Sequence, residues 1–267
     1  MRIILSLLIF LQSAIAFASF LPENDLWKED QIYKSSNIQE QTFNEILSAA
    51  QIIYTPIINA MGKDFDVIGE WDDPTVNAYA SQDGDQWEIR FFGGLARRPE
   101  MNPEGFALVV CHEIGHHIAG WPTYPRSPMA DEGNSDFFST ASCARRIFAY
   151  NSPLKLPVTS ELRGVINCNR HQDPEQVDIC KRSYVGGLSL AKLLARLAGD
   201  KTPAYETYSR KYVKQTKHEH PDAQCRLDTY YWGLICTKSW DDSKIPRTKS
   251  DFLNNSCATR PACWYKK

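Results

Sequence analysis

Two histidines and a glutamate stand at a spacing that could bind and use a metal ion. Residues 109–117 read VVCHEIGHH, so His112, Glu113 and His116 form an H-E-x-x-H pattern. Residues four apart lie above one another on a helix, so His112 and His116 would offer their imidazoles to one ion. Zinc accepts neutral imidazole in a tetrahedral shell. Glu113, rotated by about 100° around the helix, would then be placed to take a proton from a metal-activated water.

The residues around this motif predict a buried helix. We expect it to begin at Pro103, with Asn102 as its N-cap, and to end near Ala119, before a glycine and a proline. The motif is surrounded by apolar residues, namely Phe106, Ala107, Val109, Val110, Ile114 and Ile118. Buried histidines need polar partners, and a shared metal ion would supply one for each.

The third metal ligand decides which class of metallopeptidase the motif fits. A metzincin would have glycine at position 119 and histidine at 122, where this chain has Ala119 and Pro122. Glu132 on the next predicted helix is the candidate instead, with Asp131 as the alternative. Asp136 lies one helical turn after Glu132 and would accept the outer N–H of a liganding histidine, fixing its tautomer.

Two further motifs complete a resemblance to a known family. Residues 77–80 read NAYA, and residues 220–226 read HPDAQCR, an H-P-x-x-x-x-R pattern. Together with H-E-x-x-H, Glu132 and Asp136, these motifs resemble the gluzincin metallopeptidases, and within them the HtpX and CAAX-prenyl-protease family. The resemblance covers about residues 75 to 230. It implies a zincin-like fold, a Zn²⁺ cofactor and a protein or peptide substrate.

The same resemblance implies roles for three further features. His220 would hydrogen-bond the oxyanion that develops during peptide hydrolysis, and Arg226 would orient the site. Residues 87–92 would form an edge strand that holds an extended substrate. Each has a structural alternative: a histidine that merely precedes a helix, a structural ion pair, and a core strand of the same sheet.

The elements that would position these residues are mainly helical. Apolar residues recur at three and four over 38–61, which predicts an amphipathic helix ending at Gly62. Short strands are expected at 65–71, 77–81 and 87–92, and further helices at 130–150, 174–198 and 221–236, with a loop at 151–173. We therefore expect an α+β fold, mainly helical with a small mixed β-sheet, in a single domain over residues 37–267.

The N-terminus resembles a targeting segment. Arg2 precedes an apolar run over 3–11, and A-x-A patterns follow at 14–16 and 16–18. This pattern predicts a signal peptide over 1–18 and an extended lead-in over 19–36, and hence a periplasmic or extracellular protein. The apolar run is shorter than the roughly 20 residues of a membrane span, so no stable span is expected. An uncleaved N-terminal anchor is the alternative.

Cysteine usage agrees with export. Eight cysteines behind a signal peptide favour disulfide bonds, and no C-x-x-C pattern is present. Cys168 with Cys180, and Cys257 with Cys263, are the local pairings that we expect. Cys111 should be a disulfide partner or a buried thiol, since it is rotated away from the metal-binding side of its helix.

The other candidate residues receive structural interpretations. His117 should pack or support a ligand, and His171 and His218 should be exposed. The aromatic residues at 230–232 should belong to the core.

The sequence as a whole predicts an exported zinc endopeptidase. A net charge of −2 leaves no basic surplus for binding nucleic acid. Two alternatives remain open: a thermolysin-like secreted peptidase, and a zinc-stabilised binding or chaperone protein without catalytic activity.

Overall fold

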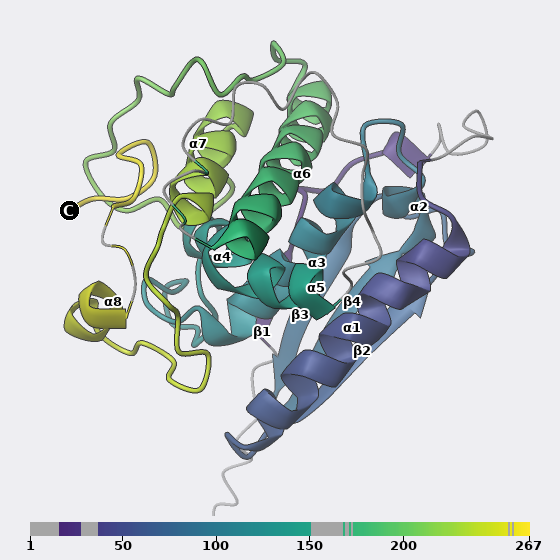
Figure 1. Cartoon of the computed structure of the whole chain (residues 1–267), viewed down its shortest axis with the longest axis horizontal. Helices are drawn as coiled ribbons and strands as arrows, with labels where there is room; N and C mark the ends of the chain where they lie inside the picture. The colour runs from purple at the N-terminus through teal and green to yellow at the C-terminus, as the bar shows by residue number, and fades with distance from the viewer. Residues whose placement is uncertain are drawn as a thin grey trace, which may run out of the picture.

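Four strands form one mixed sheet in the part of the chain that the structure describes (Figure 1). The computed structural model describes residues 16–27, 37–150, 168, 171, 173–255, 257 and 259–267. The strands are β1 (Ala16–Ser19), β2 (Asp64–Glu70), β3 (Ala78–Asp83) and β4 (Gln86–Phe92). The predicted α+β class with a small mixed sheet is confirmed.

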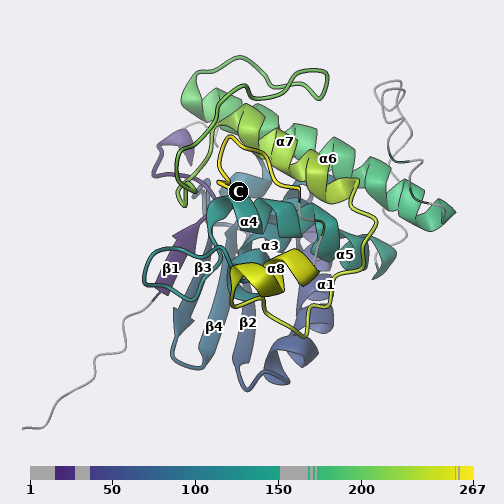
Figure 2. The ribbon, with the colours of Figure 1, turned by 90° about the vertical axis from the view of Figure 1, so that its left-hand side faces the viewer.

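The strand order is β1-β3-β4-β2, which Figure 2 shows from left to right. β4 pairs antiparallel with β3 and parallel with β2. The prediction that residues 87–92 form an edge strand is therefore wrong, and the core-strand alternative is confirmed. The physical reason is that Trp87, Ile89 and Phe91 point into the core while both sides of the strand are paired.

β1 covers the edge of β3 that would otherwise be open. It runs antiparallel to β3, with Ala18 opposite Ala80 and Ser19 opposite Tyr79. Phe20 and Leu21, which follow β1, are fully buried in the core. The end of the predicted signal peptide and the start of the predicted lead-in are thus packed against the domain. Residues 1–15 and 28–36, on which the rest of those predictions fall, lie outside the described residues.

The helices surround α3, which lies against the sheet. α3 contacts β3 and β4 on one side and α4 and α6 on the other, and α1 packs beside it on the sheet. The bounds are α1 Glu40–Asn59, α2 Gly93–Ala96, α3 Pro103–Ile118, α4 Glu132–Phe138, the π-helical turn η2 Ser139–Cys143, α5 Ala144–Tyr150, α6 Pro174–Ala198, α7 Ala223–Leu234 and α8 Lys249–Asn255. The sheet and most of the helices share the main hydrophobic core, and two smaller clusters lie between α6 and α7 and at the C-terminal segment.

The predicted helices are confirmed where local signals mark their ends. Asn102 caps α3 by accepting a hydrogen bond from the Gly105 N–H at 2.7 Å. The bounds of α6 match the prediction of 174–198. The single helix expected over 130–150 is instead interrupted by the π-helical turn. β1, α2 and α8 were not predicted, and the loop expected over 151–173 falls almost entirely outside the described residues.

Two glycines allow α4 to lie close to its neighbours. A Cβ on Gly115 of α3 would lie 3.0 Å from Ser135 Cα on α4. A Cβ on Gly133 would overlap the ring of Trp264. The first turn of α4 is therefore held between α3 and the C-terminal segment, which fixes the position of Glu132.

All eight cysteines are paired. The disulfides are Cys111–Cys143, Cys168–Cys180, Cys225–Cys263 and Cys236–Cys257. The Cys168–Cys180 prediction is confirmed, and of the two alternatives for Cys111 the disulfide is the correct one, whereas the predicted Cys257–Cys263 bond is wrong. The two C-terminal cysteines instead tie their segment to α7 and the residues that follow it. Four disulfides are typical of proteins in an oxidising compartment.

None of the described helices combines the length and the apolarity that crossing a bilayer requires.

Candidate metal centre

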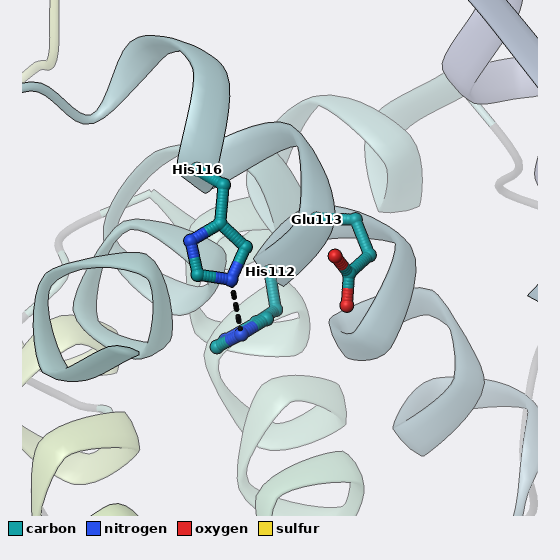
Figure 3. Close-up of side chains that lie close together, drawn as sticks. All are labelled: His112, Glu113 and His116. Atoms are coloured by element: carbon teal, nitrogen blue, oxygen red, sulfur yellow. Dashed lines mark hydrogen bonds between the residues drawn. The ribbon is translucent and has the colours of Figure 1, made fainter. Parts of the chain in front are cut away.

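His112, Glu113 and His116 form a fully buried cluster in the middle of α3. One nitrogen or oxygen atom from each side chain lies within 4.8 Å of the other two. Figure 3 shows the two imidazoles turned toward each other, with the carboxylate of Glu113 to one side. The Nε2 atoms of His112 and His116 are 3.0 Å apart. This cluster could hold a metal ion.

The tertiary structure brings Glu132, the first residue of α4, to the same point. Its Oε2 lies 3.3 Å from His112 Nε2, and its Oε1 lies 3.7 Å from His116 Nε2. Ligand atoms that surround zinc tetrahedrally at 2.0–2.1 Å are separated from one another by about 3.3 Å. Two imidazoles and a carboxylate at these separations could therefore hold a tetrahedrally coordinated metal ion.

Hydrogen bonds to the outer nitrogens fix the direction of both imidazoles. His116 Nδ1 donates to the Ala130 carbonyl at 2.8 Å, and His112 Nδ1 lies 2.8 Å from Asp136 Oδ1. A carbonyl or a carboxylate can only accept, so Nδ1 carries the proton in both rings. Both Nε2 atoms thus turn lone pairs toward the same point, where a cation or a proton is needed between them.

The surrounding charges favour a positive charge at this point. Burial lowers the pKa of His112, but the carboxylates of Asp136 and Glu132 outweigh this effect and raise it to about 9. Burial and the neighbouring His112 lower the pKa of His116 to about 3. In the ion-free chain, one proton on His112 therefore serves the pair, and a bound cation would replace that proton.

Glu113 differs from its neighbours because its carboxylate has no partner. Both of its oxygens are buried without a hydrogen bond among the described residues, as is Glu132 Oε2. Burial raises the pKa of Glu113 to about 8, against the opposing effect of His112. Buried polar atoms are nearly always satisfied in proteins. These orphaned oxygens therefore mark the place where an ion and a reacting water would be accommodated.

Asp136 and Arg226 form a buried ion pair behind His112. The guanidinium contacts both carboxylate oxygens, each at 2.7 Å, and the Tyr230 hydroxyl donates to Oδ1 at 2.9 Å. Burial raises the pKa of Asp136, but Arg226 and His112 outweigh it and lower the net value. Arg226 thus forms the ion pair that was the structural alternative for it. Through Asp136 this ion pair supports His112.

His220 lies at the rim of the cluster. Its Nε2 is 3.5 Å from Glu132 Oε2 and donates to the Ser19 carbonyl at 2.8 Å. About a quarter of its side chain is exposed. His220, the first residue of the H-P-x-x-x-x-R motif, thus lies close to the candidate metal ligands, as the resemblance implies.

Asp131, the alternative third ligand, is engaged elsewhere. Its Oδ1 accepts from the Asn134 N–H at 3.0 Å and caps α4, and its Oδ2 lies 3.1 Å from His218 Nδ1. His218 is consequently half-buried rather than exposed. The expectation that His218 is simply solvated is wrong because it pairs with this buried carboxylate.

The two remaining histidines have structural roles. His117 stacks on Trp87 with ring centroids 5.0 Å apart and accepts a hydrogen bond from Gln82 at 3.0 Å. His171 was expected to be exposed, but it is 8% exposed and donates to the Leu234 carbonyl at 2.9 Å. The prediction is wrong because His171 is buried by a contact with Leu234, 63 residues later. The polar residues around His171 give no sign of that distant contact.

Two tyrosines at the site were not predicted. The Tyr124 hydroxyl donates to Glu132 Oε1, and its ring stacks on His116 with centroids 5.9 Å apart. No pattern in its proline-rich loop marks Tyr124. Tyr230 follows Arg226 by one helical turn, so its place on the same side of α7 was available from the spacing.

No family model, no curated protein and no solved structure matches this chain. The function proposed for it therefore rests on the geometry of its own residues and on the resemblance of its motifs.

Proposed function

We propose that this protein is an exported zinc-dependent endopeptidase. His112, His116 and Glu132 would hold the ion, and Glu113 would act as general base. The observation that supports this most directly is the convergence of two Nε2 lone pairs and one carboxylate at separations near those of a tetrahedral zinc site. The four disulfides support the exported location.

The residues of the chain divide the chemistry between them. Zinc, when bound, would polarise the scissile carbonyl and make a water molecule acidic. Glu113 takes a proton from this water and passes it to the leaving amine, a role that suits a buried carboxylate with no hydrogen-bond partner in the described part of the chain. His220, at the rim, donates to the carbonyl oxygen as negative charge develops on it. Arg226 acts through Asp136, which orients His112.

The position of His220 also supports one resemblance over another. A His220 far from the candidate ligands would have favoured a thermolysin-like peptidase outside the HtpX and CAAX-prenyl-protease family. Here its Nε2 lies 3.5 Å from Glu132 Oε2. We therefore propose a zincin-like member of the HtpX and CAAX-prenyl-protease type that acts on protein or peptide substrates.

The decisive variant is Glu113→Gln. Zinc measured by mass spectrometry should stay at one ion per chain, because the ligands are intact. Cleavage of an unfolded-protein library should fall by about 10²–10⁴-fold, the usual contribution of a positioned base. His116→Ala is the matched variant, which should lose the zinc itself.

Two results would contradict the proposal. Unchanged cleavage by Glu113→Gln would show that Glu113 is not the general base. Full zinc occupancy without cleavage by any form of the chain would instead indicate a zinc-stabilised binding protein.

A further inference from the structure

The chain places one of its own peptide groups at the candidate metal centre. β1 runs antiparallel along β3 (Figure 2), and its last residue, Ser19, contacts His220 at the rim of the cluster. There the Ser19 carbonyl accepts a hydrogen bond from His220 Nε2 at 2.8 Å, and that nitrogen lies 3.5 Å from Glu132 Oε2. A backbone carbonyl thus occupies the position in which His220 would meet a substrate carbonyl.

The next two residues are held by their backbones. The Phe20 N–H donates to the Ala78 carbonyl and the Phe20 carbonyl accepts from Arg226 Nη1, both at 3.0 Å. The Leu21 N–H donates to Asn77 Oδ1 at 2.9 Å, and the Leu21 carbonyl accepts from Asn77 Nδ2 at 3.0 Å. Such backbone pairing is how a sheet edge binds an extended peptide, whatever the peptide's sequence.

One side chain of the segment is selected by a pocket. Phe20 is fully buried, with its ring edge-on to His112 at 5.3 Å and 4.7 Å from the guanidinium of Arg226. Phe17, three residues earlier, is 60% exposed. The pocket beside the metal ligand therefore suits a bulky apolar side chain directly after the peptide group at His220.

We propose that residues 16–21 act as an internal peptide that occupies the edge of β3 beside Asn77, Arg226 and His220, where an extended substrate would otherwise bind. In the exported chain this requires cleavage no later than the A-x-A pattern at 14–16, which leaves residues 17–21 in place. The proposal rests on the proposed function for its chemistry and names the substrate class: an extended chain with a bulky apolar residue after the cut. In this register the C–N bond equivalent to Ser19–Phe20 breaks. Water supplies a hydroxyl to the carbonyl carbon and a hydrogen to the nitrogen.

An external peptide must compete with this segment for the same hydrogen bonds. Asn77, Ala78 and Arg226 each already bond the segment backbone. A tethered segment acts at an effective concentration of about millimolar or more. A peptide of micromolar affinity is therefore excluded until residues 16–21 leave.

Peptide binding tests this directly, without a turnover measurement. A fluorescent peptide with the sequence of residues 17–22, FASFLP, is titrated by anisotropy into the zinc-loaded full chain carrying Glu113→Gln. Adding Phe20→Ala should tighten binding at least tenfold, because the internal segment loses its anchor. Phe17→Ala is the matched control, and it should leave the affinity within about twofold, since Phe17 lies outside the pocket. The same peptide with alanine at the position of Phe20 should bind at least tenfold more weakly.

A second variant guards against misfolding of Phe20→Ala. In an antiparallel pair every second residue of a strand is hydrogen-bonded to its neighbour. Because the Phe20 N–H donates to the Ala78 carbonyl, the preceding residue of β1 that is hydrogen-bonded to β3 is Ala18, opposite Ala80. Ala18→Pro removes that donor and leaves the pocket intact, so it should also tighten peptide binding. If circular dichroism shows folded chains but neither variant changes the affinity, residues 16–21 are only a strand of the fold and the proposal is overturned.

Cleavage separates this inference from the proposed function. With Glu113 present, faster cleavage of FASFLP by Ala18→Pro than by the unaltered chain supports both. Tighter binding of the peptide without any cleavage supports the peptide-binding site and refutes the peptidase function. A third outcome is that the unaltered chain cleaves FASFLP at a rate that neither variant increases, while mass spectrometry shows its own Ser19–Phe20 bond intact. That result refutes the internal peptide and supports the peptidase.

Discussion

Arg226 holds both carboxylate oxygens of Asp136, with Nε 2.7 Å from Oδ2 and Nη2 2.7 Å from Oδ1. Both side chains are fully buried. Because Asp136 Oδ1 also lies 2.8 Å from His112 Nδ1, the pair connects α7 through α4 to the metal-binding side of α3. The planar guanidinium of Arg226 fixes both oxygens of Asp136. Because His112 Nδ1 is hydrogen-bonded to one of these oxygens, the imidazole has little freedom to rotate.

Arg226→Lys should therefore weaken zinc binding. A lysine ammonium is a point charge that cannot contact both oxygens in a fixed plane. We expect a loss of about 10–100-fold in zinc affinity, the usual effect of changing a residue that supports a metal ligand, measured by competition with a chromophoric chelator. Arg182→Lys is the control, because this largely buried arginine bonds Glu104 away from the cluster. Equal losses in the two variants would show that Arg226 has no specific role.

Gly115→Ala should separate α4 from α3. The added Cβ would lie 3.0 Å from Ser135 Cα, so the backbone of α4 must shift and carry Glu132 away from the histidines. Overpacking of this kind costs about 1–3 kcal/mol, and zinc affinity should fall as well. Gly105→Ala, on the same helix, meets Ser189 Oγ at 2.5 Å and should lower only the melting temperature. Unchanged zinc affinity in Gly115→Ala would contradict the claimed dependence on this close approach.

Glu104 should make stability depend on pH. Burial raises its pKa to about 7, although Arg182 opposes this. From pH ~4.3, its unfolded pKa, to about 7, the folded chain keeps a proton that the unfolded chain has lost. The free energy of unfolding therefore falls as pH rises through this window, by about 4 kcal/mol in total.

Glu104→Gln, which cannot ionise, tests this dependence. Urea titrations at pH 5 and pH 8 should show the variant gaining stability relative to the unaltered chain as the pH rises. Glu45→Gln, at an exposed position of α1, is the control and should leave the pH dependence unchanged. Parallel curves for the unaltered chain and Glu104→Gln would show that this carboxyl is ionised normally.

The Cys111–Cys143 disulfide should support the metal centre as well as the fold. It joins α3, one residue before His112, to η2 across 32 residues of sequence. Replacing both cysteines with alanine should cost about 3–4 kcal/mol of unfolding free energy by loop entropy, and it should also weaken zinc binding. Replacing the Cys168–Cys180 pair should cost about 3 kcal/mol without changing zinc affinity. The contrast between the two double variants, measured by urea unfolding and chelator competition, is the expected outcome.

The sequence by itself determined the features that depend on nearby residues. The H-E-x-x-H spacing places His112 and His116 on one side of a helix because the helical repeat is local. Asn102 and Pro103 set the start of α3, and Asp173 and Gly199 flank the predicted ends of α6, because capping bonds span only a few residues. The mainly helical α+β class follows from the same local periodicities.

Only the tertiary structure decided which distant segments meet. The free edge of β3 decided that residues 16–19, which the sequence assigns to the boundary of a targeting segment and a lead-in, pair there as β1. Likewise, Cys257 and Cys263 pair with residues of α7 and its end rather than with each other, and Arg226 reaches Asp136 ninety residues earlier. Such contacts depend on how the helices pack on the sheet, and the spacing of residues along the chain carries no record of that packing.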